Sequence, residues 1–264
     1  GKGKILDQSN IEVKNLEDKI STISTDNIII ATGARTKWFS GMKPDGNQII
    51  TSKEAMNQPE QPKSLVIIGA GAIGVEFAYF YNTFGTKVTL VEALPKILPS
   101  EDEEISDLLS DIFKKKKIDI KINTCVENIE VLNTTVKVYT DNDEIIEADK
   151  ALIAVGVTGN IEDLGLENIG VKVKGGSIVT DEFMQTTIKG IYAIGDVAGP
   201  PWLAHVASEE GIVAAEHIAN ANPEPMVYNN IPGCTYCHPE VASVGLSEKS
   251  ALKAGYDIKV GKFP

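Results

Sequence analysis

Apolar positions in the middle of the chain form short runs separated by longer mixed segments. Residues 65–68 are entirely apolar, and residues 87–91 form a second, interrupted run in which Val88, Leu90 and Val91 are apolar. The segment between these two runs is long enough for a helix. Continuous apolar runs joined by helices are typical of parallel strands buried on both faces. Residues 63–156 therefore predict the order strand, helix, strand, helix, strand of a doubly wound α/β unit.

The flanking segments predict further β structure and one more helix. Residues 1–30 alternate apolar and polar positions in short pieces between turn-forming residues, which favours β-hairpins. Residues 134–147 predict a β-meander, and residues 150–155 predict a strand that returns to the sheet. Residues 191–196 predict a buried strand that ends in glycine and an acid. Residues 203–220 predict a helix with an apolar stripe.

One helix start has the sequence of a capping box. Ser100-Glu101-Asp102-Glu103 places a hydroxyl three residues before an acid, and the helix that follows ends in the lysines of residues 114–117. Acids at the start and cations at the end complement the helix dipole. We therefore expect this helix to begin at Ser100.

A turn with the pattern G-x-G-x-x-G joins the first strand of the α/β unit to its helix. Gly69 permits a tight turn, Gly71 lets the backbone approach a pyrophosphate, and Gly74 lets the helix pack close to the strand. The helix that begins near Ala72 offers unpaired N–H groups to the phosphates. Glu92 ends the next strand, where a ribose-binding acid is expected. The pattern predicts a dinucleotide site.

The residues after the second strand favour NAD over NADP. A carboxylate at Glu92 accepts hydrogen bonds from ribose hydroxyls and repels a 2′-phosphate. Residues 93–99 contain one cation, Lys96, and no arginine. Two alternatives are a glycine-rich turn with no ligand and a membrane span over residues 65–84. Glu76 and the glycines argue against the span.

Composition and charge exclude several classes of protein. The 264 residues are 42% hydrophobic and 23% charged, as in a globular protein with one large or two modest domains. The net charge of −12 argues against nucleic acid as a partner, because no basic stripe is present to neutralise phosphates. Three cysteines do not make a secreted disulfide framework. With no signal peptide at the start, we expect a cytoplasmic protein.

Taken together, these motifs resemble those of the flavin-dependent disulfide reductases, and most closely the dihydrolipoyl dehydrogenases. Their order and separation span nearly the whole chain. The residues that carry the resemblance are Ile29–Ala34, Gly69–Glu76 with Glu92, Ala193–Asp196 followed by Leu203–His205, and His238–Gly245.

The resemblance implies an α/β fold in which a Rossmann-like NAD domain is inserted into a partial FAD-binding domain. An α+β dimerisation domain would begin near the end of the chain. The implied boundaries are 1–62 for the first part of the FAD domain, 63–181 for the NAD domain, 182–228 for the second part of the FAD domain and 229–264 for the start of the interface domain.

The resemblance also implies two sets of cofactor contacts and no metal. The expected NAD contacts are Gly69, Ala70, Gly71, Ala72, Ile73, Gly74, Val75, Glu76, Glu92, Val126 and Gly156. The expected FAD contacts are Gly3, Thr32, Gly33, Ala34, Asp196, Trp202, Leu203, Ala204 and His205.

The implied activity is oxidation of dihydrolipoamide through FAD, with hydride transfer to NAD. The implied partners are a second copy of the full-length chain and the dihydrolipoyl domain of a 2-oxo acid dehydrogenase complex. No cysteine precedes Cys125, so the family's redox pair is absent, and its acid/base histidine would lie beyond Pro264. We therefore expect a central fragment that is inactive alone. Alternatives are an NADH oxidase or mercuric reductase type enzyme, and a stand-alone NAD-binding module.

Two further patterns are interpreted as structural. Cys234-Thr235-Tyr236-Cys237-His238 has the spacing of a haem attachment motif, but it lacks the context for haem, zinc or redox chemistry. His205 and Glu210 have the spacing of the family's catalytic pair, which we interpret as coincidence. His217 is expected to be structural.

Overall fold

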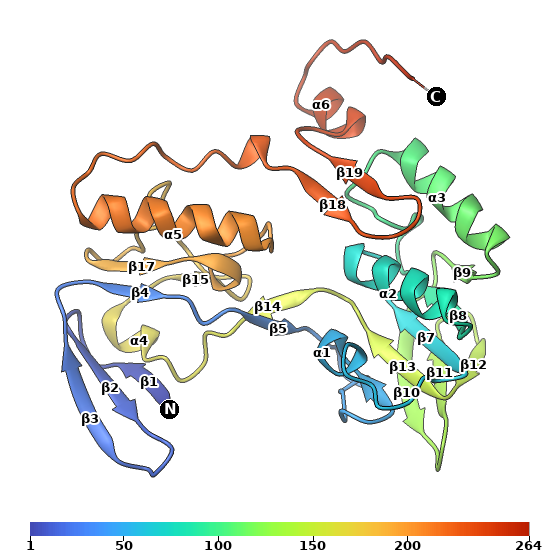
Figure 1. The fold of residues 1–264 in the computed structure, drawn as a ribbon, viewed down its shortest axis with the longest axis horizontal. Helices are drawn as coiled ribbons and strands as arrows, with labels where there is room; N and C mark the ends of the chain where they lie inside the picture. Colours follow the sequence, from blue (N-terminus) through green and yellow to red (C-terminus); the bar gives the residue numbers. More distant parts are fainter. Residues whose placement is uncertain (264) are drawn as a thin grey trace. The chain divides into compact units, whose positions relative to one another are not determined.

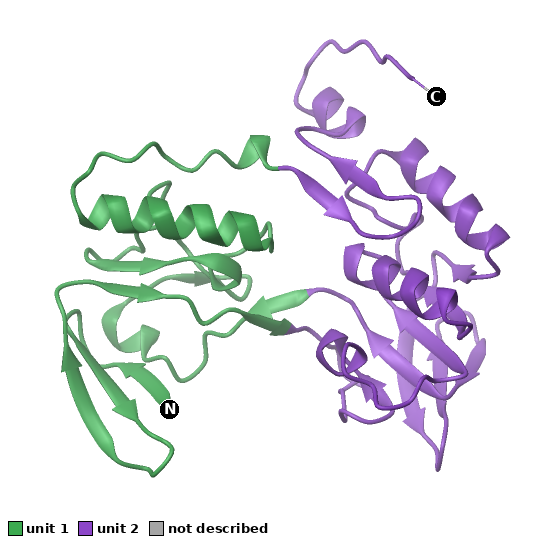
Figure 2. Cartoon of the chain, in the orientation of Figure 1, with its two compact units in different colours: residues 1–35, 157–231 green, residues 36–156, 232–264 purple. Residues whose placement is uncertain are grey.

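The computed structural model describes residues 1–263, which form two compact units (Figures 1 and 2). Unit 1 combines residues 1–35 with residues 157–231. Unit 2 combines residues 36–156 with the segment from residue 232 onward. Among the described residues, no helix has the length and apolar character needed to cross a bilayer.

Unit 2 is built on a five-stranded sheet in the order β6-β13-β7-β8-β9, in which every neighbouring pair is parallel. This arrangement confirms the predicted α/β class. The strands are β6 (Ile49–Ile50), β7 (Ser64–Ile68), β8 (Lys87–Val91), β9 (Asp119–Lys121) and β13 (Lys150–Ile153).

Both faces of this sheet are covered, which explains the continuous apolar runs. Leu65 and Leu90 pack in one cluster with residues of α2 (Ala72–Thr83) and α3 (Glu103–Lys115). Val66 and Val91 pack in a second cluster against the antiparallel meander. The meander consists of β10 (Val126–Val131), β11 (Val136–Thr140) and β12 (Ile145–Ala148). The predicted range of residues 134–147 covers β11 and most of β12 and leaves out β10.

The predicted capping box at Ser100 is wrong. Helix α3 begins at Glu103, and its N-cap residue Asp102 makes no capping hydrogen bond with its side chain. The Asp102 carboxylate instead accepts the backbone N–H of Glu248 at 2.7 Å. A capping box does occur at Thr51, before the short helix α1 (Ser52–Ala55).

The C-terminal segment of unit 2 is a β-hairpin followed by a helix. Its elements are β18 (Gly233–Thr235), β19 (Val241–Ser243) and α6 (Glu248–Lys253). Cys237 and Val241 belong to the same core cluster as the α2 residues. The hairpin is thus packed on the first helix of the α/β unit.

Unit 1 combines a three-stranded antiparallel sheet with a parallel pair of strands. The sheet contains β1 (Lys2–Ile5), β2 (Asn10–Lys14) and β3 (Ile20–Ser24), which confirms the predicted hairpins. The parallel pair is β4 (Ile28–Ile30) and β17 (Ile191–Ala193), and the predicted helix is α5 (Ala204–Ile218). The remaining elements are β5 (Ala34–Thr36), which pairs with β14 (Val157–Gly159), α4 (Leu166–Ile169), β15 (Val173–Lys174), β16 (Ser177–Ile178), and the 3₁₀ turns η1 (Gly195–Val197) and η2 (Tyr228–Asn230).

The two units divide the chain at different residues from the predicted domain boundaries. Residues 49–50 pair with β13 and so belong to the sheet of unit 2. Residues 157–181 belong to unit 1, where Leu166 and Ile178 share a core cluster with Ile5 and Ile191. The assignment of particular segments to FAD, NAD and interface domains stays a prediction.

Candidate functional site

In unit 2, three strands end at the same edge of the sheet. Because β7, β8 and β13 are parallel neighbours, their carboxyl ends lie side by side, as Figure 1 shows. Gly69 follows β7, Glu92 follows β8 and Gly156 follows β13. In open α/β sheets this edge is where ligands bind. The structure therefore brings these three predicted NAD contacts together.

The glycine-rich turn has the geometry that the sequence pattern requires. Gly69 has a φ of +100°, and a methyl group there would lie 2.7 Å from the carbonyl carbon of Ala154. A methyl group at Gly74 would overlap the carbonyl oxygen of Gly69. At Gly71, by contrast, a methyl group would meet no atom within 4 Å. Gly69 and Gly74 thus permit close packing, while Gly71 faces open space.

The first turn of α2 supplies free backbone donors beside this space. Gly71 is the N-cap residue and provides no side-chain capping bond. Ala72 is exposed and Ile73 is half-buried, whereas Ala70 and Val75 are fully buried. Helix N-termini with uncapped N–H groups bind phosphate groups well. The turn and the helix start therefore fit a pyrophosphate.

Glu92 points toward the glycine-rich turn. One carboxylate oxygen accepts the N–H of Ala70 at 2.7 Å, and the other accepts the N–H of Leu94 at 2.8 Å. The side chain is buried. Each carboxylate oxygen can accept more than one hydrogen bond, so both retain capacity for a ribose hydroxyl. The position and charge of Glu92 fit the adenosine ribose of NAD.

Lys96, the one cation in residues 93–99, is already paired with a carboxylate. Lys96 Nζ lies 2.5 Å from one carboxylate oxygen of Asp107 and 2.6 Å from the other. A 2′-phosphate would have to compete with that carboxylate for the ammonium and would also face Glu92. The local charges therefore suit NAD better than NADP.

The N–H of Thr124 donates to the carbonyl of Glu92, which brings the start of β10 at Val126 to this edge, and Gly156 follows β13 there. Val126 is the first residue of β10 and is half-buried against the meander core. Gly156 has a φ of +105° and open space where a side chain would be. Gly156 also accepts the N–H of Lys37 through its carbonyl oxygen.

Glu76 connects α2 to the C-terminal hairpin. Its carboxylate accepts the backbone N–H of Tyr236 at 2.8 Å. Tyr236 lies just after β18, so this bond spans 160 residues of sequence. The bond fixes the carboxylate one turn into the helix that starts at the candidate pyrophosphate site.

In unit 1, the predicted FAD contacts follow the two parallel strands. Thr32, Gly33 and Ala34 come after β4, and Asp196 lies in η1 directly after β17, so these contacts share one edge. Gly33 has a φ of +71° and open space around it. The other predicted contacts lie elsewhere in the unit: Gly3 is on β1, and Trp202, Leu203, Ala204 and His205 lead into α5, with Trp202 and His205 exposed.

A polar network that the sequence did not reveal fixes the Thr32 segment. The Thr32 hydroxyl donates to the carbonyl of Asn160 at 2.7 Å, and the Asn160 amide donates to the carbonyl of Thr32 at 2.9 Å. Arg35 donates to Asn160 and pairs with Glu162. The hydrogen bond between the Arg35 guanidinium and the Glu162 carboxylate raises the pKa of Arg35 and lowers the pKa of Glu162. Thr32 and Asn160 are 128 residues apart in sequence, so no local pattern links them.

Glu210 is a second residue whose role was not evident from the sequence. Its carboxylate is buried and accepts the N–H of Gly195 at 2.6 Å and the hydroxyl of Tyr228 at 2.8 Å. Burial raises the pKa of Glu210. The buried positions of α5 are 206, 210, 213 and 214, so the helical period itself places this acid in the apolar stripe. Glu210 holds the turn that carries Asp196.

The remaining motif residues have packing roles. Cys237 is buried in the unit 2 core, its thiol donates to the carbonyl of Pro239, and burial raises its pKa to about 11. His217 stacks on Phe183 and hydrogen-bonds the Tyr192 hydroxyl at 3.1 Å. In the described part of the chain, no group of three or more histidine, cysteine, aspartate or glutamate side chains is arranged to hold a metal ion.

Comparison with known protein families gives two matches. Residues 2–211 match the model described as pyridine nucleotide-disulphide oxidoreductase. Residues 231–264 match the dimerisation domain of the same group. The first match covers most of the chain.

Curated relatives agree with these models. The chain is 47% identical over 255 residues to the dihydrolipoyl dehydrogenase of Rhizobium etli, covering 95% of this chain and 53% of that protein. It is 40% identical over 269 residues to the dihydrolipoyl dehydrogenase of Zymomonas mobilis, covering 100% of this chain and 58% of that protein. The chain thus spans about half the length of the curated relatives it matches.

Solved structures share the fold. LpdA from Mycobacterium tuberculosis superposes with a TM-score of 0.90 at 27% identity, over 97% of this chain and 57% of that one. The Cu(II) complex of the HOCl-induced flavoprotein disulfide reductase RclA from Escherichia coli superposes with a TM-score of 0.89 at 30% identity. That match covers 98% of this chain and 59% of the other.

Proposed function

The chain belongs to the pyridine nucleotide-disulphide oxidoreductase family, and on this premise we propose that it is the central part of a dihydrolipoyl dehydrogenase. The whole enzyme would oxidise dihydrolipoamide through FAD and reduce NAD. The observation that supports this most directly is the turn at Gly69–Gly74 with Glu92 directed toward it, in a chain 40–47% identical to dihydrolipoyl dehydrogenases.

The residues of unit 2 divide the work of holding NAD. The open N-terminus of α2 at Gly71 and Ala72 would hold the pyrophosphate, and Glu92 would hold the adenosine ribose. Glu76, fixed by Tyr236, would line the nicotinamide end together with Val126 and Gly156. NAD supplies the hydride acceptor when it is bound. The chain's own contribution is to orient it and to exclude the 2′-phosphorylated form.

The residues of unit 1 would hold part of FAD. Asp196 would bind the ribityl chain, and the segment from Trp202 to His205 would lie near the flavin ring. Glu210 positions Asp196 through the N–H of Gly195. FAD supplies the redox centre between the thiol substrate and NAD when it is bound.

The partners and location follow from the same proposal. Residues 231–264 match the start of a dimerisation domain, which supports a homodimer in the full-length protein. A dihydrolipoyl domain of a 2-oxo acid dehydrogenase complex would deliver the substrate. The three cysteines of the chain are free, which suits a reducing compartment, and we propose the cytoplasm.

The test is made on the product of the whole gene that contains these residues. We expect it to reduce NAD, and not NADP, with dihydrolipoamide as the donor. We expect the 264-residue chain alone to bind NADH and to show no turnover. Oxidation of NADH by oxygen or by Hg(II), without any reaction of dihydrolipoamide, would instead favour an NADH oxidase or a mercuric reductase. A gene product that binds NADH without flavin or turnover would be a binding module.

A further inference from the structure

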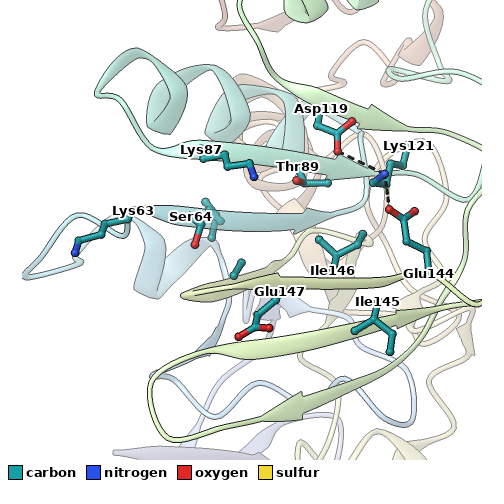
Figure 3. Close-up of a pocket in the computed structure, with 12 residues that line it drawn as sticks. Lys63, Ser64, Lys87, Thr89, Asp119, Lys121, Glu144, Ile145, Ile146 and Glu147 are labelled. Carbon is teal, nitrogen blue, oxygen red and sulfur yellow. Dashed lines mark ion pairs between the residues drawn. The ribbon is translucent and has the colours of Figure 1, made fainter.

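A cavity of about 500 Å³ lies in unit 2 between β12 and the sheet, lined by the amino ends of β7 and β8 and by residues of β9 (Figure 3). Parallel strands start at one edge of a sheet and end at the other. Ser64 and Lys87 therefore lie toward the edge opposite Gly69 and Glu92, and none of the predicted NAD contacts lines the cavity. Its volume is within the usual range of sites for small organic ligands.

The two-residue period of the strands directs polar side chains into this cavity. Val66 and Val91 pack against the meander, so residues two or four positions away on the same strand face the meander as well. These positions are Ser64 on β7 and Lys87 and Thr89 on β8, and all three residues line the cavity. A sheet face that is apolar further along thus becomes polar where the strands begin.

Thr89 carries a buried hydroxyl to which no group in residues 1–263 hydrogen-bonds. The residue is only 7% exposed, and among the described residues its hydroxyl has no hydrogen-bond partner. No fully enclosed side-chain oxygen or nitrogen in the described chain lacks a partner, so the Thr89 hydroxyl must open into the cavity. A buried hydroxyl without a protein partner costs free energy unless a ligand or water binds it.

Lys87 supplies the free positive charge. Figure 3 shows its ammonium group directed toward Thr89, while the Lys63 ammonium group points away. Lys121 also lines the cavity but is neutralised, because its Nζ lies 2.8 Å from Glu144 and 3.5 Å from Asp119. Within residues 1–263, Lys87 makes no ion pair, so its charge is available to a ligand.

The balance of charge and apolar surface defines the ligand. One free ammonium faces a cavity that is also lined by Asp119, Glu144 and Glu147. These carboxylates repel a dianion such as phosphate about twice as strongly as a monoanion, so a single carboxylate matches the single ammonium better. Ile146 and Ala148, which point to the sheet-facing side of β12, supply apolar surface for a short hydrocarbon chain.

We propose that this cavity binds a small aliphatic monocarboxylate. The carboxylate accepts hydrogen bonds from the Lys87 ammonium and the Thr89 hydroxyl, and its hydrocarbon chain lies against Ile146 and Ala148. The proposal rests on side chains at the amino edge of the sheet and is independent of the cofactors and the reaction.

The test titrates the 264-residue chain with butyrate and follows the methyl and amide NMR signals. We expect saturable shifts of Thr89, Ile146 and Ala148 at millimolar butyrate. Butyramide, which lacks the charge, and inorganic phosphate should bind with an affinity at least about tenfold lower, measured from the same signals. Absence of saturation with butyrate, or equal affinity for butyramide or phosphate, would overturn the proposal.

Variants assign the binding to these residues. Lys87→Met keeps the side-chain stem without the charge, and Thr89→Val keeps the shape without the hydroxyl. Each should weaken butyrate binding by about tenfold or more, since a hydrogen bond to a charged group is lost. Lys115→Met on α3 is the control and should bind as the unmodified chain does. If one of the two variants fails to fold, seen as loss of NMR signal dispersion, the other variant tests the assignment. Unchanged butyrate affinity in a folded variant would contradict it.

Discussion

Two glycines of one turn should respond to the same substitution in opposite ways. A methyl group at Gly74 would overlap the carbonyl oxygen of Gly69 and lie 3.0 Å from its carbonyl carbon and 3.4 Å from Ile67 Cγ2. Ordinary carbon contacts are about 3.5–4.0 Å. A methyl group at Gly71 would meet nothing within 4 Å. Gly74→Ala should therefore perturb folding, and Gly71→Ala should perturb ligand binding.

The magnitudes follow from these contacts. Overpacking costs about 1–3 kcal/mol, and overlap with a backbone oxygen places Gly74→Ala near the upper end. Replacing glycine by alanine inside a helix stabilises the helix by about 1 kcal/mol, which offsets part of this cost. The free energy of unfolding should thus fall by about 2 kcal/mol. For Gly71→Ala the loss is about 1 kcal/mol or less, the effect of alanine at an N-cap.

The assay combines denaturation with NADH binding. Trp38 lies in unit 2 and Trp202 in unit 1, so a Trp202→Phe background leaves Trp38 to report on the unfolding of unit 2 in urea. NADH affinity is measured by fluorescence titration. Gly71→Ala should weaken NADH binding at least about tenfold, because its methyl group occupies the space proposed for the pyrophosphate.

Two results would refute this reasoning. One is a Gly74→Ala variant as stable as the unmodified chain, which would mean that α2 does not need its close approach to β7. The other is a Gly71→Ala variant that folds and binds NADH with unchanged affinity, which would place the pyrophosphate elsewhere.

Three further predictions address single side chains. Glu92→Gln should lower the preference for NADH over NADPH by about tenfold, measured by paired titrations, because the repelling charge is lost; an unchanged ratio would contradict the ribose role. The raised pKa of Glu210 means that the folded chain holds this proton more tightly than the unfolded chain. The contribution of Glu210 to stability should therefore decrease as pH rises from about 4.3 through the raised pKa of the folded state. The difference in urea stability between the unmodified chain and Glu210→Gln should decrease over the same pH range. A difference that stays constant with pH would contradict the burial argument. At pH 8, a thiol reagent should modify exposed Cys125 in the native chain and leave Cys237 unmodified until urea is added, because burial raises the pKa of Cys237 to about 11.

Local patterns in the sequence were enough to predict the α/β class and the position of the dinucleotide turn. Strand and helix periods depend on near neighbours, and the glycine spacing reflects a backbone path only a few residues long. The position of Glu92 followed from the length of one strand-helix-strand unit. These features therefore appear in the sequence before any long-range contact is known.

Tertiary structure decided what each polar side chain contacts. The ion pair of Arg35 with Glu162 spans 127 residues, and the bond from Tyr236 to Glu76 spans 160. Neither spacing has a local signature. Packing of the meander over the sheet likewise left the Thr89 hydroxyl in a cavity, although its sequence neighbours suggest only a core strand. Hydrogen bonds and burial depend on which surfaces meet when the chain closes on itself, and no short segment carries that information.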